Sequence, residues 1–242
     1  MERFTLITGS SSGMGEYCAK ILSHTRRLIL ASENLDTLQY VRQHCENPER
    51  HVVWHCDFAK QRTEIFDSLS KVLKENDACV DEYVHFAGLT QILPIRNFTI
   101  PYVDKIFNVN FFSIIEILRV LLRKSNGKAL KNIVLISAMV SQRGDVGNSV
   151  YAASKGAINS LVYSLSQELA PEVRINAIMP GAVMTTMVDK VDPCHIEKLK
   201  NETPLGLGYP EDVVHYVEFL LSDKSRWITG QSIFVDGGRS TK

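Results

Sequence analysis

The chain lacks net charge and paired cysteines. Its 27 Lys and Arg residues balance its 27 Asp and Glu residues, so neither nucleic acid nor a membrane surface is expected as a partner. Its five cysteines are scattered and contain no C-x-x-C motif. This argues against a metal site such as zinc and against a disulfide framework, and it predicts reduced thiols in a cytoplasmic protein.

Long uncharged apolar runs are also missing. The longest apolar stretch, Phe107 to Leu122, is interrupted by Asn110, Glu116 and other polar side chains, so we expect no transmembrane helix. The first predicted strand begins close to Met1, which we expect to leave no room for a signal peptide. With 45% apolar residues, no repeat and no linker, residues 1–242 are expected to form a single domain.

A glycine-rich turn follows the first apolar segment. Phe4 to Thr8 has the composition of a buried strand, and the sequence GSSSGMG then leads into a helical pattern near 14–23. A strand, a glycine turn and a helix are the context that a dinucleotide-binding loop requires, because the pyrophosphate sits at the helix N-terminus. Taken alone, the same residues are also compatible with an ordinary Gly/Ser turn.

Strand-like and helical segments alternate along the chain. The further predicted strands are 27–31, 51–56, 83–86, 132–137, 174–179 and 232–235, and the further predicted helices are 34–45, 60–75, 101–124, 151–169 and 210–221. Mostly apolar strands that alternate with helices predict an α/β fold: a doubly wound, Rossmann-type parallel sheet with helices on both faces. Ligands bind such sheets at the carboxyl ends of the strands.

Tyr151 and Lys155 stand four residues apart in a predicted helix, so both side chains lie on one face. An ammonium beside a phenol favours the phenolate and lowers the phenol pKa, which makes the pair a candidate for proton transfer. A Tyr and a Lys at this spacing also occur on many solvated helices, and that alternative stands if the pair is taken alone.

Together these segments resemble the single-domain branch of the short-chain dehydrogenase/reductase family, from Phe4 to Gly238. The Thr8-Gly9-x-x-x-Gly13-x-Gly15 loop and the Tyr151-x-x-x-Lys155 pair match family motifs, and Val109-Asn110-Phe111 resembles the segment of its proton-relay asparagine. Residues 228–238 resemble the tails of 3-oxoacyl-carrier-protein reductases and of bacterial sugar or alcohol dehydrogenases. The resemblance implies the following cofactor-binding residues: Gly9, Ser11, Ser12, Gly13, Met14, Gly15, Ser32, Asp57, Phe58, Ala87, Gly88, Tyr151, Lys155, Pro180, Gly181, Val183 and Thr185.

The resemblance implies reversible hydride transfer between a nicotinamide cofactor and a carbonyl or secondary alcohol. Tyr151 is then the general acid/base, Lys155 lowers its pKa and binds the ribose, and Asn110 holds a water. A 3-oxoacyl thioester is the leading substrate. A keto-sugar or polyol, and a non-catalytic nucleotide-binding protein of the same fold, are the alternatives. The family also implies a homodimer or homotetramer formed through helices 101–124 and 151–169.

The usual catalytic serine of the family, thirteen residues before the tyrosine, is Ala138 here. Ser137 is the candidate replacement, because a shift of one residue at a strand end reverses the direction of a side chain. Ser141 on the following loop is a second candidate.

Two other segments bear on specificity. The second strand ends in Ser32-Glu33, which lacks the basic residue typical of NADP-binding members, and a carboxylate at Glu33 would repel a 2′-phosphate. We therefore favour NAD over NADP. Residues 186–207, which follow the predicted nicotinamide loop, are expected to form a substrate lid.

Overall fold

The computed structural model describes residues 1–185 and 193–241, with side chains after the gap described from residue 196. Seven parallel strands form one sheet in the order β3-β2-β1-β4-β5-β6-β7. They are β1 (Glu2–Thr8), β2 (Leu28–Ser32), β3 (Val52–His55), β4 (Ala78–His85), β5 (Asn132–Ile136), β6 (Arg174–Pro180) and β7 (Ser232–Val235). The predicted α/β class and the parallel sheet are confirmed.

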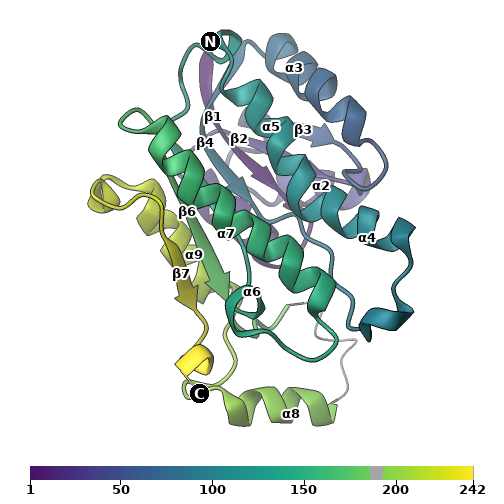
Figure 1. Cartoon of the computed structure of the whole chain (residues 1–242). Coiled ribbons are helices and arrows are strands. Elements are labelled where there is room, and N and C mark those ends of the chain that lie inside the picture. Colours follow the sequence, from purple (N-terminus) through teal and green to yellow (C-terminus); the bar gives the residue numbers. More distant parts are fainter. Residues whose placement is uncertain (186–192, 242) are drawn as a thin grey trace.

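Helices cover both faces of this sheet (Figure 1). One face carries α1 (Gly13–Ser23), α2 (Leu35–Gln43) and α9 (Pro210–Leu221), and the other carries α3 (Ile65–Glu75), α5 (Ser113–Leu121) and α7 (Ser149–Leu169). Each layer of helices contributes to its own hydrophobic core. The strands are therefore apolar on both sides, as all five buried residues of β2 illustrate.

The order in which strands are added to the sheet reverses between β1 and β4. The chain runs outward from β1 through β2 to β3, then returns to the other side of β1 and continues from β4 to β7. The loops after β1 and β4 therefore diverge at the carboxyl edge of the sheet, which is where doubly wound folds bind ligands.

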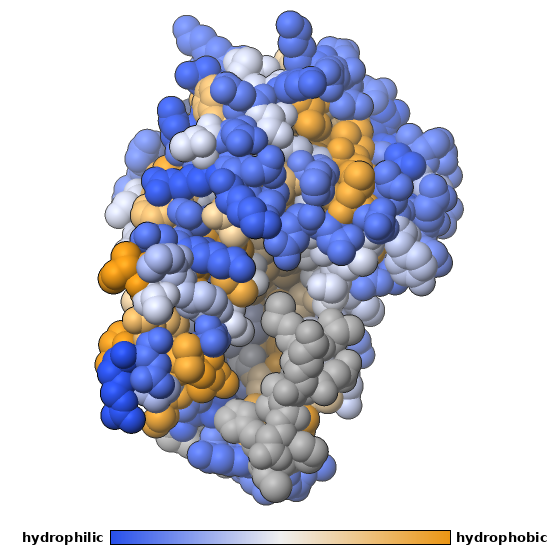
Figure 2. Space-filling model, turned by 90° about the vertical axis from the view of Figure 1, so that its right-hand side faces the viewer, coloured by the Kyte–Doolittle hydropathy of each residue, from blue (hydrophilic) through white to orange (hydrophobic). Residues whose placement is uncertain are grey.

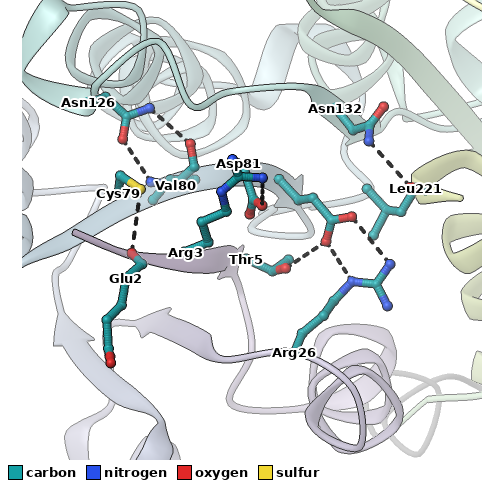
Figure 3. Close-up of polar contacts among 11 residues, drawn as sticks. Glu2, Arg3, Thr5, Arg26, Cys79, Val80, Asp81, Asn126, Asn132 and Leu221 are labelled. Carbon is teal, nitrogen blue, oxygen red and sulfur yellow. Dashed lines mark hydrogen bonds and ion pairs between the residues drawn. The ribbon is translucent and has the colours of Figure 1, made fainter.

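Three segments differ from the sequence prediction. Strand β4 begins at Ala78, five residues earlier than expected, because its polar centre is paired rather than exposed. Glu82 accepts hydrogen bonds from Arg26 (Nε, 2.6 Å) and from Thr5 (Oγ1, 2.7 Å). Figure 3 labels the two donors, Thr5 and Arg26, which point toward the same carboxylate. Helix α6 (Val140–Arg143) and helix α8 (Pro193–Glu202) were not predicted.

The predicted helix 101–124 is divided into α4 (Ile100–Phe107), a π-helical segment η4 (Asn108–Phe112) and α5. A π-helical turn inside an α-helix is frequent at functional sites, since it re-aims side chains and carbonyl groups. None of the described helices combines the length and the apolar content that a membrane crossing requires.

Candidate active site

The loop after β1 brings the start of α1 close to the end of β4. Gly9 has a φ of +67°, and a Cβ placed on it would lie 2.6 Å from the backbone nitrogen of Ala87. A Cβ on Gly15 would collide with the carbonyl oxygen of Gly9. Both positions therefore require glycine. The result is an open helix N-terminus at the switch point of the sheet, a geometry suited to a pyrophosphate.

A cleft opens at this point. Twelve of the predicted cofactor-binding residues line it: Gly9, Ser11, Ser12, Gly13, Met14, Gly15, Ser32, Asp57, Phe58, Ala87, Gly88 and Thr185. They come from five loops that are far apart in the sequence. Figure 2 looks at the right-hand side of Figure 1 and shows that this face of the molecule is hollowed near its centre.

Three other predicted residues lie at the end of β6 and do not line this cleft. Pro180 ends the strand, the amide of Gly181 donates to the carbonyl of Val235 (3.1 Å), and Val183 forms a β-bridge with Gly208. They shape the loop that carries Thr185, whose methyl group lies 3.4 Å from a Cβ placed on Gly13.

The cleft also contains residues that are outside the predicted cofactor-binding set: Cys56, Ala59, Phe86, Leu89, Lys105 and Val109. Among these residues, Lys105 could have been predicted from the sequence. It stands four residues before Val109 and hence on the same helix face as a residue that adjoins the predicted Asn110.

Tyr151 and Lys155 lie on the same face of α7, beside this cleft. The Lys155 ammonium is 5.9 Å from the centre of the Tyr151 ring and donates a hydrogen bond to the carbonyl of Ile136 at the end of β5 (2.7 Å). It would also lie 3.3 Å from a Cβ placed on Gly88, a residue that lines the cleft. Gly88 thus joins the glycine cleft to the Tyr–Lys pair, and a Cβ at this position would crowd the Lys155 ammonium.

Burial controls the protonation of the pair in the protein alone. It raises the pKa of Tyr151 to about 12 and lowers the pKa of Lys155 to about 7. The expected lowering of the tyrosine pKa by the neighbouring ammonium is therefore outweighed by desolvation. At neutral pH the phenol carries its proton, which is the state that an acid needs in order to protonate a carbonyl oxygen.

Asn110 is fully buried in the π-helical segment and connects two parts of the site. Its Oδ1 accepts from the amide of Leu89 (2.7 Å), and its Nδ2 donates to the carbonyl of Leu89 (3.0 Å) and to Ser154 Oγ (2.9 Å). Asn110 Oδ1 and the Lys155 ammonium both lie beside Gly88. The asparagine therefore holds the loop after β4 against α7, next to Lys155.

The hydroxyl of Ser137 is hydrogen-bonded within the protein. It is buried and donates to the backbone carbonyl of Lys155 (2.9 Å), with Ser141 Oγ 3.4 Å away. Ser141 in turn donates to the carbonyl of Ala138 (2.6 Å) and accepts from Asn159 (2.8 Å). Both candidate hydroxyls are thus engaged within the protein, and this geometry does not support Ser137 as a donor to a substrate.

His85, at the end of β4, is a buried structural histidine. Its Nδ1 lies 2.8 Å from Thr8 Oγ1 and 2.7 Å from the Tyr83 hydroxyl. Burial, together with the charge of Lys155, lowers its pKa to about 3. It is therefore neutral and braces β1 against β4.

A family model described as Enoyl-(Acyl carrier protein) reductase, of the short-chain alcohol dehydrogenase type, matches residues 9–240. The chain belongs to the short-chain dehydrogenase/reductase family.

Relatives match over nearly their full length. The chain is 32% identical over 238 residues to a 3-oxoacyl-[acyl-carrier-protein] reductase of Rickettsia conorii, covering 97% of this chain and 95% of the relative. It is 31% identical over 242 residues to L-xylulose reductase of Bos taurus, covering 98% and 96%. Among solved structures, the 3-oxoacyl-[acyl-carrier protein] reductase of Brucella melitensis superposes with a TM-score of 0.88 at 25% identity, covering 98% of this chain and 91% of that chain.

This short-chain dehydrogenase/reductase is therefore an NAD(P)-dependent oxidoreductase that acts on a carbonyl or an alcohol. The residues present fit such a cofactor: the helix start at Gly13 suits the pyrophosphate, and Ser32, which ends β2, and Asp57, which follows β3, line the same cleft. When bound, the nicotinamide supplies or accepts the hydride.

Proposed function

We propose that this protein reduces the 3-oxo group of an acyl thioester, with Tyr151 as the proton donor. The observation that carries the proposal is the contact at Gly88, where the cleft for the dinucleotide meets the Lys155 ammonium and, through it, Tyr151. Lys155 stabilises the phenolate that forms when the proton leaves Tyr151. Asn110 fixes the loop after β4 and keeps Lys155 in register with that loop.

The acyl thioester is favoured by the similarity to the Rickettsia reductase and by exposed apolar side chains close to the start of α7. Ile92, Ile95 and Val146 are exposed on the two loops that flank the start of α7, and these loops are joined by a hydrogen bond from the Leu93 amide to the Gly147 carbonyl (2.9 Å). Apolar side chains also gather beside the hollow in Figure 2. An exposed apolar rim suits an acyl chain better than a polyol.

A keto-sugar is the second candidate, because the bovine L-xylulose reductase is similar over the same length. The test is a panel of acetoacetyl thioesters, diketones and keto-sugars, with oxidation of NADH and NADPH followed by absorbance. We expect the highest kcat/KM with the thioesters. A higher value with a keto-sugar would replace the acyl thioester, and no turnover with any carbonyl would contradict catalysis by Tyr151.

For the cofactor we propose NAD. Glu33 and Ser32 line the cleft after β2, where Ser32 Oγ lies 2.7 Å from Ser11 Oγ. Among the described residues that line the cleft, Lys105 alone is a cation, and it comes from α4 rather than from β2. A carboxylate without a neighbouring arginine disfavours a 2′-phosphate. One structural relative, a 4-hydroxyisoleucine dehydrogenase with a TM-score of 0.90 and 25% identity over the whole of both chains, was solved with NADH.

We further propose a cytoplasmic homodimer or homotetramer. Exposed Leu122 near the end of α5 and exposed Tyr163 on α7 leave apolar surface on the two helices that the family uses for association. Sedimentation is expected to show a species of at least twice 27.2 kDa. A monomer at micromolar concentration would contradict this assignment. The lid predicted for 186–207 stays a proposal: 186–192 lie outside the described residues, and α8 occupies most of the rest.

A further inference from the structure

One buried arginine near the C-terminus links two segments that border the active site. Arg239, in the short 3-10 turn η8 (Arg239–Thr241), is 6% exposed. Its Nη2 donates to Oε2 of Glu202, the last residue of α8 (2.7 Å), and lies 3.5 Å from Oδ2 of Asp145. Asp145 belongs to the loop between α6 and α7, six residues before Tyr151. Figure 1 shows α8 beside the C-terminus, below α6 at the carboxyl end of the sheet.

The backbone around Arg239 is held in place. Asp236 accepts hydrogen bonds from the amides of Gly238 (3.0 Å) and Ser240 (2.7 Å), which fixes the turn on both sides of the arginine. The carbonyl of Gly237 accepts from the amide of Leu205, just after α8 (3.1 Å). The backbone that carries Arg239 is therefore fixed. Less conformational entropy is then lost when its guanidinium binds Glu202 and Asp145.

The two carboxylates are only partly buried, whereas the cation between them is almost fully buried. The side chains of Glu202 and Asp145 are 33% and 37% exposed, against 8% for Arg239. The hydrogen bond from Arg239 lowers the pKa of Glu202, so the link is charged at neutral pH. Without Arg239, the carboxylates of Glu202 and Asp145 would both face water. The contact through which α8 is held to the loop that contains Asp145 would be lost.

The linked segments border the substrate side of the site and are separate from the dinucleotide cleft. The loop that contains Asp145 also carries exposed Val146 and leads directly into the first turn of α7, where Tyr151 lies. The segment after α8 carries exposed Leu205 and pairs with the loop after β6 through Gly208. Arg239 is not among the residues that line the cleft.

We propose that Arg239 is a positioning residue that holds α8 against the loop before Tyr151 and so sets the affinity for the carbonyl substrate. The inference rests on the proposed function for its kinetic consequence, but the physical link can be measured without turnover. Arg239 acts through these two segments and touches no reacting atom.

The decisive variant is Arg239→Gln, with Arg239→Lys as the conservative variant. For Arg239→Gln we expect kcat/KM for the carbonyl substrate to fall by about 10- to 100-fold, chiefly through KM, because a small misplacement of substrate walls has effects of this size. The Kd for NADH should change by less than about twofold, since Arg239 lies outside the cleft. Arg239→Lys keeps the charge and should recover most of the loss.

The matched control is Lys198→Gln. Lys198 is another cation close to Glu202, at 3.8 Å and 68% exposed, but it lies on α8 itself rather than on the C-terminal turn. We expect its kinetics to stay within about twofold of wild type, as for other exposed pairs. Glu202→Gln keeps a side-chain oxygen that can accept from Arg239 but removes the charge, so it should show a smaller loss than Arg239→Gln. It also provides a second test if Arg239→Gln does not fold.

Hydrogen exchange gives the independent readout. In Arg239→Gln, amides in 196–205 and in 144–150 should exchange faster together, whereas Lys198→Gln should leave the second segment unchanged. Wild-type kinetics in Arg239→Gln, equal losses of carbonyl and NADH affinity, or faster exchange in the C-terminal turn alone would each overturn the inference. A wild-type protein inactive on every carbonyl would contradict the proposed function instead, and coupled exchange of the two segments would still support the link.

Discussion

The Lys155 ammonium lies 5.9 Å from the centre of the Tyr151 ring and is hydrogen-bonded to the carbonyl of Ile136, with the Gly88 backbone between it and the dinucleotide cleft. In the protein alone, desolvation outweighs the attraction between the two groups, so the phenol keeps its proton while the amine is close to losing its own. Burial therefore disfavours the charged form of both groups, and Tyr151 holds the proton that it would donate.

Tyr151→Phe should lower kcat for carbonyl reduction by about 10²- to 10⁴-fold, the usual contribution of a general acid. Binding of NADH, measured by fluorescence titration, should be almost unchanged because the Phe ring fills the same space. Tyr163→Phe is the control, since Tyr163 is exposed on the same helix. Equal activity in Tyr151→Phe and wild type would remove Tyr151 from the mechanism.

The buried amine makes stability depend on pH. Burial lowers the pKa of Lys155 from 10.5 to about 7, so between these values the unfolded chain binds a proton that the folded protein does not. Stability must then rise with pH across this window. Relative to Lys155→Met, we expect the free energy of unfolding of the wild type to increase by about 2 kcal/mol from pH 7 to pH 9.

This difference is measured by urea unfolding of both proteins without cofactor. The comparison with Lys155→Met cancels the other titrating groups, because they are common to both proteins. The Tyr151 pKa of about 12 keeps the phenol protonated throughout the window. A difference that stays constant or shrinks as the pH rises would show that the amine remains charged in the folded protein.

Two substitutions test which position supplies the catalytic hydroxyl that the family usually has. Ser137 donates to the Lys155 carbonyl, so Ser137→Ala should keep kcat within about fivefold of wild type, the cost of one ordinary hydrogen bond. Ala138→Ser introduces a hydroxyl at the position where the family usually has one and should raise kcat by up to about 10²-fold. A loss of 10² or more in Ser137→Ala would restore Ser137 as the substrate donor.

Glu33 is expected to set the preference between the two cofactors. Replacing it by arginine removes the carboxylate from the cleft after β2 and offers a cation to a 2′-phosphate. The ratio of kcat/KM for NADPH to that for NADH should rise by more than about tenfold in Glu33→Arg. Glu33→Gln should fall between the two proteins. A wild-type protein that already prefers NADPH would contradict the role given to Glu33.

The fold and the glycine loop could be predicted because they depend on local patterns. Apolar strands that alternate with helices leave few arrangements other than a doubly wound sheet, and the glycines at 9 and 15 are required by backbone contacts that no other residue allows. The length of β4 was underestimated because Asp81 and Glu82 suggest a surface segment. Their partners, Arg3 and Arg26, come from the neighbouring strand β1 and from the residues just before β2.

The Ser137 hydroxyl shows what reasoning from local sequence does not supply. The direction of a side chain at the end of a strand depends on which acceptor it meets, and here that acceptor is a carbonyl on α7, eighteen residues away. The break at Asn108–Phe112 is a similar case, because a helix that is apolar around most of its surface gives no sign of the position at which its turns widen.

By itself, the sequence determined the class of fold, the cleft for a dinucleotide and the pairing of Tyr151 with Lys155, because each follows from spacing within one strand, one turn or one helix. Only the tertiary structure decided the protonation of that pair, the orientation of Ser137 and the link through Arg239. Each of these depends on desolvation or on contacts between segments distant in the chain, and such free energies arise only when those segments pack together.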